Sequence, residues 1–327
     1  MGRAKQALEA NGLVAIPTET VYGLAANALN PKAVARIFEA KQRPSFDPLI
    51  IHIPDQSKLD KYASQIPDKA QKLAEQLWPG PLTMVLPKRD VIPDLVTSGL
   101  DTVAIRSPRH PLTHQLLQSL DFPLAAPSAN PFGYLSPTQP AHVADQLGLE
   151  VDYILDGGPA KVGLESTIIS FSDPSKIELL RAGGYPREEI EEILGQALSV
   201  RTHSSSNPRA PGMLVQHYSP HTPLLVIDAD EKPEEADILK HIQQVGEIST
   251  ARIAHIAFDL SKPQPNWASS HYKWSENGDL RQAAARLFAL LRTLDQMKYD
   301  LIVAERVPET GLGTAINDRL ARAAARS

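Results

Sequence analysis

Hydroxyl, amide and basic side chains gather in a few short segments of this 327-residue chain. The segments are Pro17–Thr20, Ala104–Ser107, Ala126–Asn130, Glu165–Thr167 and Leu180–Gly184. Each adjoins a short apolar run of the kind that forms a buried strand. Because α/β proteins bind ligands at the ends of their strands, these segments are candidates for one common binding site.

Arg106 and Arg181 each follow apolar residues, so each guanidinium would emerge from an otherwise buried strand. Such a group needs an anionic partner, because its desolvation is costly. The partner could be a ligand phosphate or carboxylate, or one of the 38 acidic residues of the chain itself. Both alternatives stay open for either arginine alone, whereas two such strands together favour a ligand.

Lys41 and Arg43 stand in the sequence Lys-Gln-Arg-Pro, at the end of a predicted helix. Pro44 directs Arg43 toward an extended backbone, so the two cations need not share one helical face. Both could therefore reach a triphosphate. The alternative is that basic residues simply favour the C-terminus of a helix, where they offset its dipole.

Other polar residues allow two interpretations each. His52 lies in an apolar strand, where a lone histidine is more often a hydrogen-bonded core residue. Ser128 and Ser166 could cap helices or turns as readily as they could bind a ligand. Tyr218 could anchor the linker in which it stands, or the linker could fold back over a site.

Several common chemistries are excluded by missing motifs. The chain has no GxxxxGK[ST] phosphate loop, and its one GxG, Gly311–Gly313, follows no predicted strand and lacks a third glycine. HExxH, GxSxG and paired-histidine spacings are also missing, so we expect no protein metal site and no serine hydrolase. With no cysteine, thiol nucleophiles and thiolate zinc sites are excluded as well.

The elements that position these residues follow an α/β pattern. Buried strands are predicted at Leu13–Ile16, Val103–Ile105, Leu124–Ala126, Tyr153–Leu155, Thr167–Phe171 and Ile177–Leu180. A helix is predicted from Asn30-Pro31, a cap followed by proline in the first turn, to Lys41. The N-terminal apolar stretch before Pro17 is too short for a signal peptide or membrane span, so we expect a cytoplasmic protein that contacts no membrane.

The length of the chain favours two domains. A stretch rich in serine and proline, without apolar periodicity, predicts a linker over 201–222 between domains at 1–200 and 223–327. The second domain has three strand-like runs and a helix opened by Asp279. Its basic end, 319–326, is interpreted as a solvated helix face rather than an RNA anchor. Since the net charge is −5, any RNA contact must be local and weak.

Taken together, these segments resemble the YrdC-type threonylcarbamoyl-AMP synthases, in the longer form with a C-terminal domain. The similarity runs through IPTETVYGLAANA, IFEAKQRPSFDPLIIHI, WPGPLTMVL, GLDTVAIRSP, LAAPSAN, ILDGG, GLESTIISF, LLRAGG and APGMLVQHYSP. It covers most of residues 10–220. The KxR and SxN motifs of that family appear as Lys41–Arg43 and Ser128–Asn130.

The resemblance implies a YrdC-like twisted mixed sheet with a deep positive cavity, followed by a smaller Rossmann-like α/β domain. It implies an enzyme that joins ATP, L-threonine and bicarbonate and releases pyrophosphate, with the linker closing over the site. The threonine-binding positions would be Thr20, His52, Arg106, Ala126 and Ser166. The ATP-binding positions would be Arg43, Asp47, Thr102, Ser128, Asn130, Ser136, Arg181 and Tyr218, with Lys41 and Arg43 as the catalytic pair.

Two departures from the family pattern matter. Asp47 stands where many members have asparagine, and a carboxylate beside a triphosphate is repulsive unless a metal or Lys41 offsets it. Leu214–Gln216 replaces basic residues that many relatives have before the HYSP segment. Mg²⁺ is expected to arrive with ATP, although no carboxylate cluster dedicated to it is visible.

Two rival functions are weighed against this interpretation. Carbamoyltransferases that contain YrdC-type modules carry further catalytic domains, for which this chain has no room. The second rival is a non-catalytic RNA-binding module. A test for ATP turnover would distinguish the enzyme from such a module. If the synthase interpretation holds, a separate transferase must move the threonylcarbamoyl group to the adenosine beside the tRNA anticodon.

Overall fold

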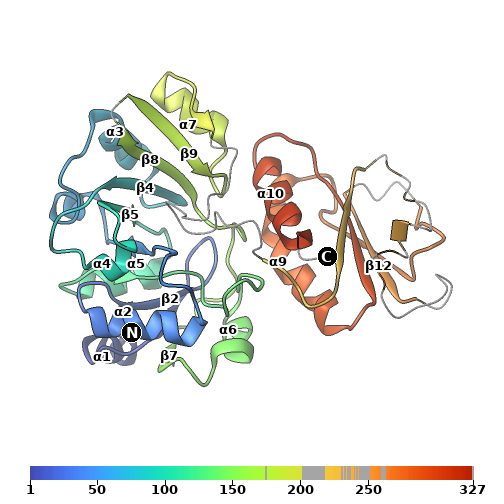
Figure 1. The fold of residues 1–327 in the computed structure, drawn as a ribbon, viewed down its shortest axis with the longest axis horizontal. Helices are drawn as coiled ribbons and strands as arrows, with labels where there is room; N and C mark the ends of the chain where they lie inside the picture. The colour runs from blue at the N-terminus through green and yellow to red at the C-terminus, as the bar shows by residue number, and fades with distance from the viewer. Residues whose placement is uncertain are drawn as a thin grey trace. The chain divides into compact units, whose positions relative to one another are not determined.

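The computed structural model describes residues 1–173, 175–200, 218–229, 231, 233, 237–238, 240, 242, 251–258 and 263–325. The chain divides into two compact units (Figure 1). The first comprises Met1–Phe132 and Ser136–Leu214, and the second comprises Gly133–Leu135 and Val215–Ser327. The short segment Gly133–Leu135 thus belongs to the second unit, which the sequence did not predict. Most of the predicted linker, 201–217, lies outside the described residues.

The first unit is built on a ten-stranded mixed sheet in the order β10-β9-β8-β4-β5-β3-β6-β2-β1-β7. Its strands are β1 (Val14–Ile16), β2 (Gly23–Asn27), β3 (Ile50–His52), β4 (Leu82–Pro87), β5 (Thr102–Arg106), β6 (Leu124–Ala125), β7 (Tyr153–Ile154), β8 (Thr167–Asp173), β9 (Lys176–Arg181) and β10 (Ser199–Val200). β3 pairs with β5 and β4 with β8 in parallel, while β4 and β5 are antiparallel. The prediction of a mixed sheet is confirmed, and each predicted strand of this unit is present.

Helices accompany the sheet of the first unit. They are α1 (Gly2–Glu9), α2 (Pro31–Lys41), α3 (Asp68–Leu77), α4 (Asp94–Thr97), α5 (Pro111–Ser119), α6 (Pro140–Leu147) and α7 (Arg187–Leu194), with a 3₁₀ turn η1 (Gln56–Lys61). α2 begins as predicted, because the Asn30 side chain accepts a hydrogen bond from the Lys32 amide at 2.9 Å. α2 ends at Lys41, because the next residue, Gln42, adopts the left-handed conformation with a φ of 52°.

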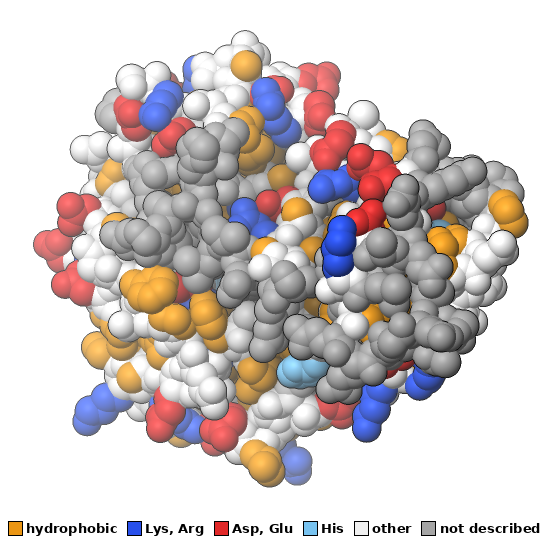
Figure 2. Space-filling model, turned by 45° about the vertical axis from the view of Figure 1, so that its right-hand side comes forward, with side chains coloured by type: hydrophobic (Ala, Val, Ile, Leu, Met, Phe, Trp, Pro, Cys, Tyr) orange, Lys and Arg blue, Asp and Glu red, His pale blue; other side chains and the backbone are white. Residues whose placement is uncertain are grey.

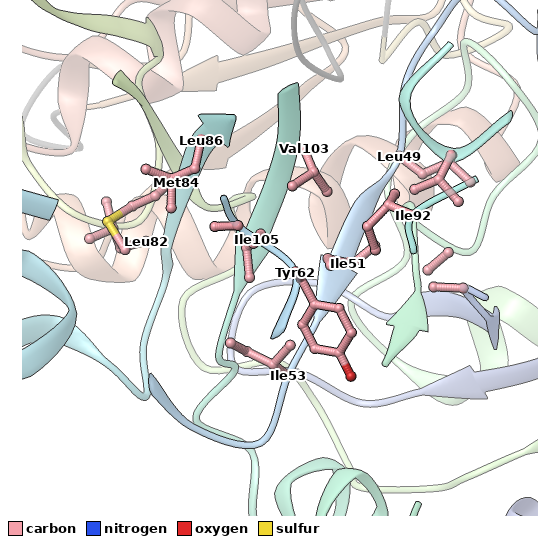
Figure 3. Close-up of a cluster of buried hydrophobic side chains, with 14 of the residues drawn as sticks. Leu49, Ile51, Ile53, Tyr62, Leu82, Met84, Leu86, Ile92, Val103 and Ile105 are labelled. Carbon is pink, nitrogen blue, oxygen red and sulfur yellow. The ribbon is translucent and has the colours of Figure 1, made fainter. Parts of the chain in front are cut away.

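The central strands bury one face in the main hydrophobic core (Figure 3). The residues on that face are Leu49, Ile51 and Ile53 around β3, Leu82, Met84 and Leu86 on β4, and Val103 and Ile105 on β5. Burying each such side chain contributes roughly 1.5–3 kcal/mol. Because side chains alternate along a strand, the intervening residues His52, Thr83 and Arg106 share the opposite face of the sheet. The core packing therefore determines which face can carry the polar site.

The second unit is a smaller α/β structure with a four-stranded parallel sheet, as expected of a Rossmann-like domain. Its elements are β11 (Leu224–Ile227), β12 (Ile253–Ala257), β13 (Ser270–Lys273), β14 (Leu301–Glu305), α9 (Leu280–Gln296) and α10 (Gly313–Ala324), and the strand order is β11-β14-β12-β13. Asp279 caps α9 as predicted, accepting a hydrogen bond from the Arg281 amide at 2.8 Å. β13 was missed, because its sequence Ser-His-Tyr-Lys has no apolar run.

Gly311–Gly313 does not directly follow a strand, because Gly311 stands six residues after the last residue of β14 and Gly313 begins α10. One prediction for the second unit was wrong. The basic end of the chain is not simply a solvated face, because Arg319 is buried on α10 with its guanidinium 5.2 Å from the centre of the Tyr218 ring. Among the described residues, the search for helices of membrane-spanning length and hydrophobicity finds none.

Candidate active site

A single row of side chains crosses strands β3, β5, β4, β8 and β9. In the register of the sheet, Arg106 lies opposite both His52 and Thr83. Thr83 pairs in turn with Ile168, and Ile168 pairs with Arg181. Directly paired residues face the same side of a sheet. The row therefore brings three predicted site residues, His52, Arg106 and Arg181, onto the face opposite the main core.

Arg106 is buried and contacts three different groups of the chain. Its Nε donates to the Gly80 carbonyl at 3.2 Å and its Nη1 donates to Thr20 Oγ1 at 2.9 Å. Its Nη2 lies 2.8 Å from Glu19 Oε1, and that carboxylate is also buried. Glu19 Oε2 accepts a further bond from the Arg109 amide at 3.0 Å. The internal ion pair considered for Arg106 is thus present, and Glu19, Thr20 and Gly80 together hold the guanidinium in place.

The turn that follows β1 presents Thr20. Thr18 Oγ1 accepts hydrogen bonds from the Thr20 amide at 3.1 Å and the Val21 amide at 3.2 Å. The two threonine hydroxyls are 2.7 Å apart. A hydroxyl that binds the backbone ahead of it in this way stabilises a tight turn. The turn therefore holds Thr20 in place independently of its hydrogen bond with Arg106.

Ser166 joins the other half of the row. Its hydroxyl is 2.7 Å from Thr83 Oγ1, and its carbonyl accepts from Arg181 Nε at 3.1 Å and Nη2 at 2.9 Å. Arg181 Nη2 is also 3.2 Å from Ser166 Oγ. A predicted threonine-binding residue and a predicted ATP-binding residue are therefore in direct contact, so the two predicted binding regions share a border.

His52 is buried between β5 and β6 in the sheet. Burial lowers its pKa to about 3, and the charge of Arg106 acts in the same direction. His52 is therefore a neutral imidazole at neutral pH. A neutral ring can donate one hydrogen bond and accept another, which suits either a core residue or a contact to a substrate hydroxyl.

Lys41, the last residue of α2, and Arg43, two residues later, are both buried. Lys41 Nζ donates to the Ser128 carbonyl at 2.6 Å and to the Asn130 carbonyl. Arg43 donates from Nε to the Asp47 carbonyl at 3.1 Å and from Nη2 to the Pro48 carbonyl at 2.9 Å. The KxR and SxN motifs are thus connected directly through Lys41.

Asp47 lies among these cations. Its Oδ2 is 2.9 Å from Arg43 Nη2, and its side chain is fully buried. Burial raises its pKa, while the charges of Arg43, Lys41 and Arg181 oppose that rise. The pKa of Lys41 is well below its usual value, mainly through burial and then through repulsion by Arg43. Like charges are therefore crowded in this part of the site, which favours an anionic ligand.

The remaining predicted residues are more scattered. Ser136 Oγ donates to Glu165 Oε1 at 2.6 Å, and the Ala126 amide donates to the Ile50 carbonyl at 3.0 Å. Thr102 begins β5, four residues before Arg106 and so about 13 Å along the strand. Tyr218 lies in the second unit, buried with its ring 5.4 Å from that of Phe288.

Comparison with known proteins identifies the family. Residues 6–183 match the family of Sua5, YciO and YrdC proteins, described as "Telomere recombination", and residues 185–325 match "Threonylcarbamoyl-AMP synthase, C-terminal domain". The threonylcarbamoyl-AMP synthase of Pyrococcus abyssi is 42% identical over 95% of this chain and 90% of its own length. The chain belongs to the threonylcarbamoyl-AMP synthase family. The Bacillus subtilis synthase is also 42% identical, over 99% of this chain and 92% of its own.

The fold of the family is shared over nearly the whole chain. The crystal structure of P. abyssi Sua5 complexed with L-threonine superimposes with a TM-score of 0.86 and 39% identity, covering 98% of this chain and 93% of that one. This agreement extends to both units of this member of the threonylcarbamoyl-AMP synthase family.

Sequence reasoning missed three polar residues of the site: Glu19, Thr83 and Glu165. Glu19 and Glu165 stand inside segments that the sequence singled out, but nothing local shows that one would pair with Arg106 and the other with Ser136. Thr83 is a lone hydroxyl in the apolar strand β4. The alternation of β4 could have predicted its face, but not its partner Ser166.

No group of three or more histidine and acidic side chains that could hold a metal ion occurs within the described ranges. On the face drawn in Figure 2, the described acidic and basic side chains are interspersed rather than separated into a broad basic surface.

Proposed function

We propose that the first unit forms L-threonylcarbamoyl-AMP and pyrophosphate from L-threonine, bicarbonate and ATP, for the threonylcarbamoyladenosine modification of tRNA. Family membership over nearly the full chain supports this activity. The observation that carries the proposal is the row joining Arg106 to Arg181 across the sheet. Two buried guanidinium groups on one face, one beside hydroxyl groups and the other beside a basic cluster, fit an amino acid next to a nucleotide.

L-Threonine is assigned to the half of the row around Arg106. A guanidinium carries five N–H donors, and its planar fork matches a carboxylate. The contacts of Arg106 to Gly80, Thr20 and Glu19 orient that fork. Hydroxyl groups of Thr20 and Ser166 can bond the polar groups of the substrate, which would discriminate against an amino acid such as valine. Neutral His52 adds a donor and an acceptor without adding charge.

The triphosphate of ATP is assigned to Lys41, Arg43 and Arg181, which together neutralise its charge. The proposed ATP-binding set has one carboxylate, Asp47. Its other members are Ser128, Asn130, Ser136, Thr102 and Tyr218. Mg²⁺ prefers phosphate and water oxygens to a cage of protein ligands, so the residues present are compatible with an ion carried in by ATP. That ion would neutralise charge on the phosphates.

The proposed reaction needs alignment more than acid–base chemistry. The threonine amine and bicarbonate combine with loss of water to give a carbamate. A carbamate oxygen then forms a bond to the α-phosphorus, while the bond from that phosphorus to the departing pyrophosphate breaks. Positioning and neutralisation of charge supply most of the catalysis in phosphoryl chemistry of this kind. Arg106 would hold the nucleophile, and Lys41, Arg43 and Arg181 would stabilise the leaving group.

The product needs a partner that transfers the threonylcarbamoyl group to the adenosine beside the tRNA anticodon. We propose a cytoplasmic location, where ATP, threonine and that transferase would meet. Weak RNA binding by the chain itself is the second candidate function, and the tRNA-binding measurement described below tests it.

The test is pyrophosphate release by the full chain with ATP and bicarbonate, comparing L-threonine, L-serine, L-valine and no amino acid. Arg43→Ala should lower kcat/KM for ATP about 10- to 100-fold, the cost of one or two charged hydrogen bonds. Since Arg43→Ala would leave Asp47 buried without its ion partner, the double variant Arg43→Gln, Asp47→Asn separates loss of activity from loss of folding. Arg36→Ala is the matched control, because Arg36 is a half-exposed arginine of α2, the helix that precedes Arg43.

Release that requires both threonine and bicarbonate, and that falls in the Arg43 variants alone, supports the synthase. Intact ATP under every condition, with tRNA retained at low salt, would instead favour the RNA-binding module. The salt dependence of that binding would then count the phosphate contacts.

A further inference from the structure

Thr83 and Ser166 form a buried pair of hydroxyl groups in the first unit. Their oxygen atoms, Thr83 Oγ1 and Ser166 Oγ, are 2.7 Å apart, and the two residues are 0% and 1% exposed. Arg181 Nη2 also donates to Ser166 Oγ, at 3.2 Å. Thr83 thus contacts a side chain assigned to L-threonine, although it has no assigned part in the reaction itself.

The backbone around Ser166 is held without the help of Thr83. The Ser166 carbonyl accepts two hydrogen bonds from Arg181, at 3.1 Å and 2.9 Å. The next residue, Thr167, donates its amide to the Pro81 carbonyl at 2.9 Å. Removal of the Thr83 hydroxyl should therefore leave the path of this segment unchanged.

The rotation of the Ser166 hydroxyl is what these backbone bonds leave free. A serine side chain has three staggered positions about χ1, and its proton can also turn about the C–O bond. Thr83 is more restricted, because its side chain is β-branched and β4 is paired on both sides, with β5 and with β8. Its neighbours Leu82 and Met84 are fixed in the main core on the other face. The Thr83 hydroxyl can therefore hold the Ser166 hydroxyl in one orientation.

The hydrogen bonds of the pair leave one proton for a ligand. Two hydroxyl groups carry two protons, and the single bond between them uses one. Within the part of the chain that the structure describes, that bond and the bond from Arg181 are the only ones that the two hydroxyls make. A buried hydroxyl proton without an acceptor is unfavourable. The pair is therefore suited to donate one hydrogen bond to an oxygen of a substrate.

Thr83 also lies beside Arg106. The two residues are directly paired between β4 and β5, so their side chains share a face of the sheet with Cβ atoms about 4.5–5.5 Å apart. In L-threonine the carboxylate and the hydroxyl are carried by adjacent carbon atoms. One molecule can therefore reach Arg106 with its carboxylate and the hydroxyl pair with its own hydroxyl.

We propose that Thr83 is a positioning residue for L-threonine, which holds the Ser166 hydroxyl so that it donates to the hydroxyl oxygen of the bound amino acid. Arg106 is assigned to the carboxylate, and the lone pair of the amine is consumed in forming the carbamate. The hydroxyl oxygen is the acceptor of L-threonine that remains for Ser166. The inference rests on the proposed function, because it takes Ser166 and Arg106 as threonine contacts. It makes Thr83 a determinant of the preference for threonine over valine, which has the same shape without the hydroxyl.

The test measures initial rates of pyrophosphate release by the full chain, varying ATP and L-threonine separately. Thr83→Val keeps the β-branched shape and removes the hydroxyl. We expect KM for threonine to rise about five- to tenfold, the cost of one hydrogen bond, with KM for ATP and the inhibition constant of L-valine unchanged. Thr83→Ser restores a hydroxyl at the same place and should keep KM for threonine within about threefold of the wild type, because its side chain is less restricted.

A double-mutant cycle with Ser166→Ala shows whether Thr83 acts through Ser166. If it does, Thr83→Val combined with Ser166→Ala should have the same KM for threonine as Ser166→Ala alone. Thr97→Val is the matched control, because Thr97 is another buried threonine, whose hydroxyl donates to the Asp94 carbonyl at 3.4 Å. It should leave both KM values at the wild-type level. Multiplicative effects in the double variant, an equal rise in KM for ATP, an equal effect of Thr97→Val, or no rescue by Thr83→Ser would overturn the proposal.

The wild-type rate separates this inference from the proposed function. If the wild type turns over and Thr83→Val matches it in every constant, the function stands and the positioning role fails. If the wild type shows no threonine-dependent turnover, the proposed function fails, and calorimetric titration with L-threonine then decides the positioning role. Weaker binding by Thr83→Val would support that role, whereas equal binding, or no binding to either protein, would overturn it. Should Thr83→Val not fold, Thr83→Cys carries the same comparison, because a thiol is only a weak hydrogen-bond donor.

Discussion

Buried charges occur in both units, but they are arranged differently. In the second unit, Glu305 at the end of β14 accepts from the Phe258 amide at 3.1 Å and lies 3.4 Å from His255 Nε2. Its contacts join the ends of neighbouring strands. In the first unit, Lys41, Arg43 and Arg181 all act on Asp47, and Arg43 further depresses the pKa of Lys41. In the second unit the buried carboxylate is satisfied by a backbone amide and a histidine, whereas in the first unit three cations surround one carboxylate, and the excess of positive charge indicates a place for an anionic ligand.

The largest effect should come from breaking the ion pair in the first unit. Arg106→Gln leaves Glu19 buried without its partner and should lower the free energy of unfolding by about 3–5 kcal/mol. Adding Glu19→Gln should recover most of that stability without recovering threonine-dependent pyrophosphate release. Denaturant unfolding and the rate assay on both variants check this. If the double variant regained full activity, Arg106 would not be part of the active site.

The counterpart in the second unit should affect stability alone. Glu305→Ala leaves the Phe258 amide without its acceptor and should cost about 1–3 kcal/mol. Fluorescence unfolding in a Trp78→Phe background reports on this unit, because Trp267 and Trp274 are then the remaining tryptophans. KM for ATP and for threonine should not change. A shift in either constant would mean that Glu305 affects substrate binding, so that the buried charges of the two units would not have separate roles.

His52 should give the first unit a dependence on pH. Its pKa is about 3 in the folded chain and near 6.5 when unfolded. Between these values the unfolded state binds a proton that the folded state does not, so stability falls as pH decreases below about 6.5. The slope from this residue is at most about 1.4 kcal/mol per pH unit. Unfolding of His52→Gln between pH 7 and 5 should show a shallower slope, and an identical slope would contradict it.

The smallest effect is expected at Asp47. Asp47→Asn keeps the backbone carbonyls of Asp47 and Pro48 that hold Arg43, and it removes a negative charge beside the proposed triphosphate site. KM for ATP should fall about two- to fivefold, because Arg43, 2.9 Å from the carboxylate, offsets most of its repulsion of the phosphates. Nucleotide titration at constant ionic strength measures it. A higher KM would instead indicate that the carboxylate faces the ion carried by ATP.

The sequence predicted elements well where local chemistry determines them. The cap at Asn30, the proline after it and the apolar spacing of α2 are all local, and so is the alternation that buries Ile51 and Ile105. β2 was not anticipated, because Gly-Leu-Ala-Ala-Asn has neither branched residues nor a clear period. Its place in the sheet depends on pairing with β1 and β6 rather than on its own preference.

The sequence predicted which residues belong to the candidate site better than it predicted which of them contact one another. Arg106 and Arg181 were singled out because each ends an apolar run, but their common row depends on the register of β4 against β5 and β8. The partner of Arg106 was undecidable from the sequence, since any acidic residue could have filled that role. The bond from Tyr134 to Asp295 could not be predicted for the same reason, because the two residues lie far apart in the sequence.

The row across the sheet also constrains the order in which this protein can be made. Thr20 and Arg181 stand near opposite ends of the first unit's sequence, and the parallel pairs β3–β5 and β4–β8 close long loops. Such a topology has high contact order and folds slowly. At ribosomal speeds of about 5–20 residues per second, on the order of ten seconds separate the emergence of the two residues. During that interval β4 lacks its neighbour β8, and β8 lacks β9, so the sheet stays open at β4 until late in synthesis.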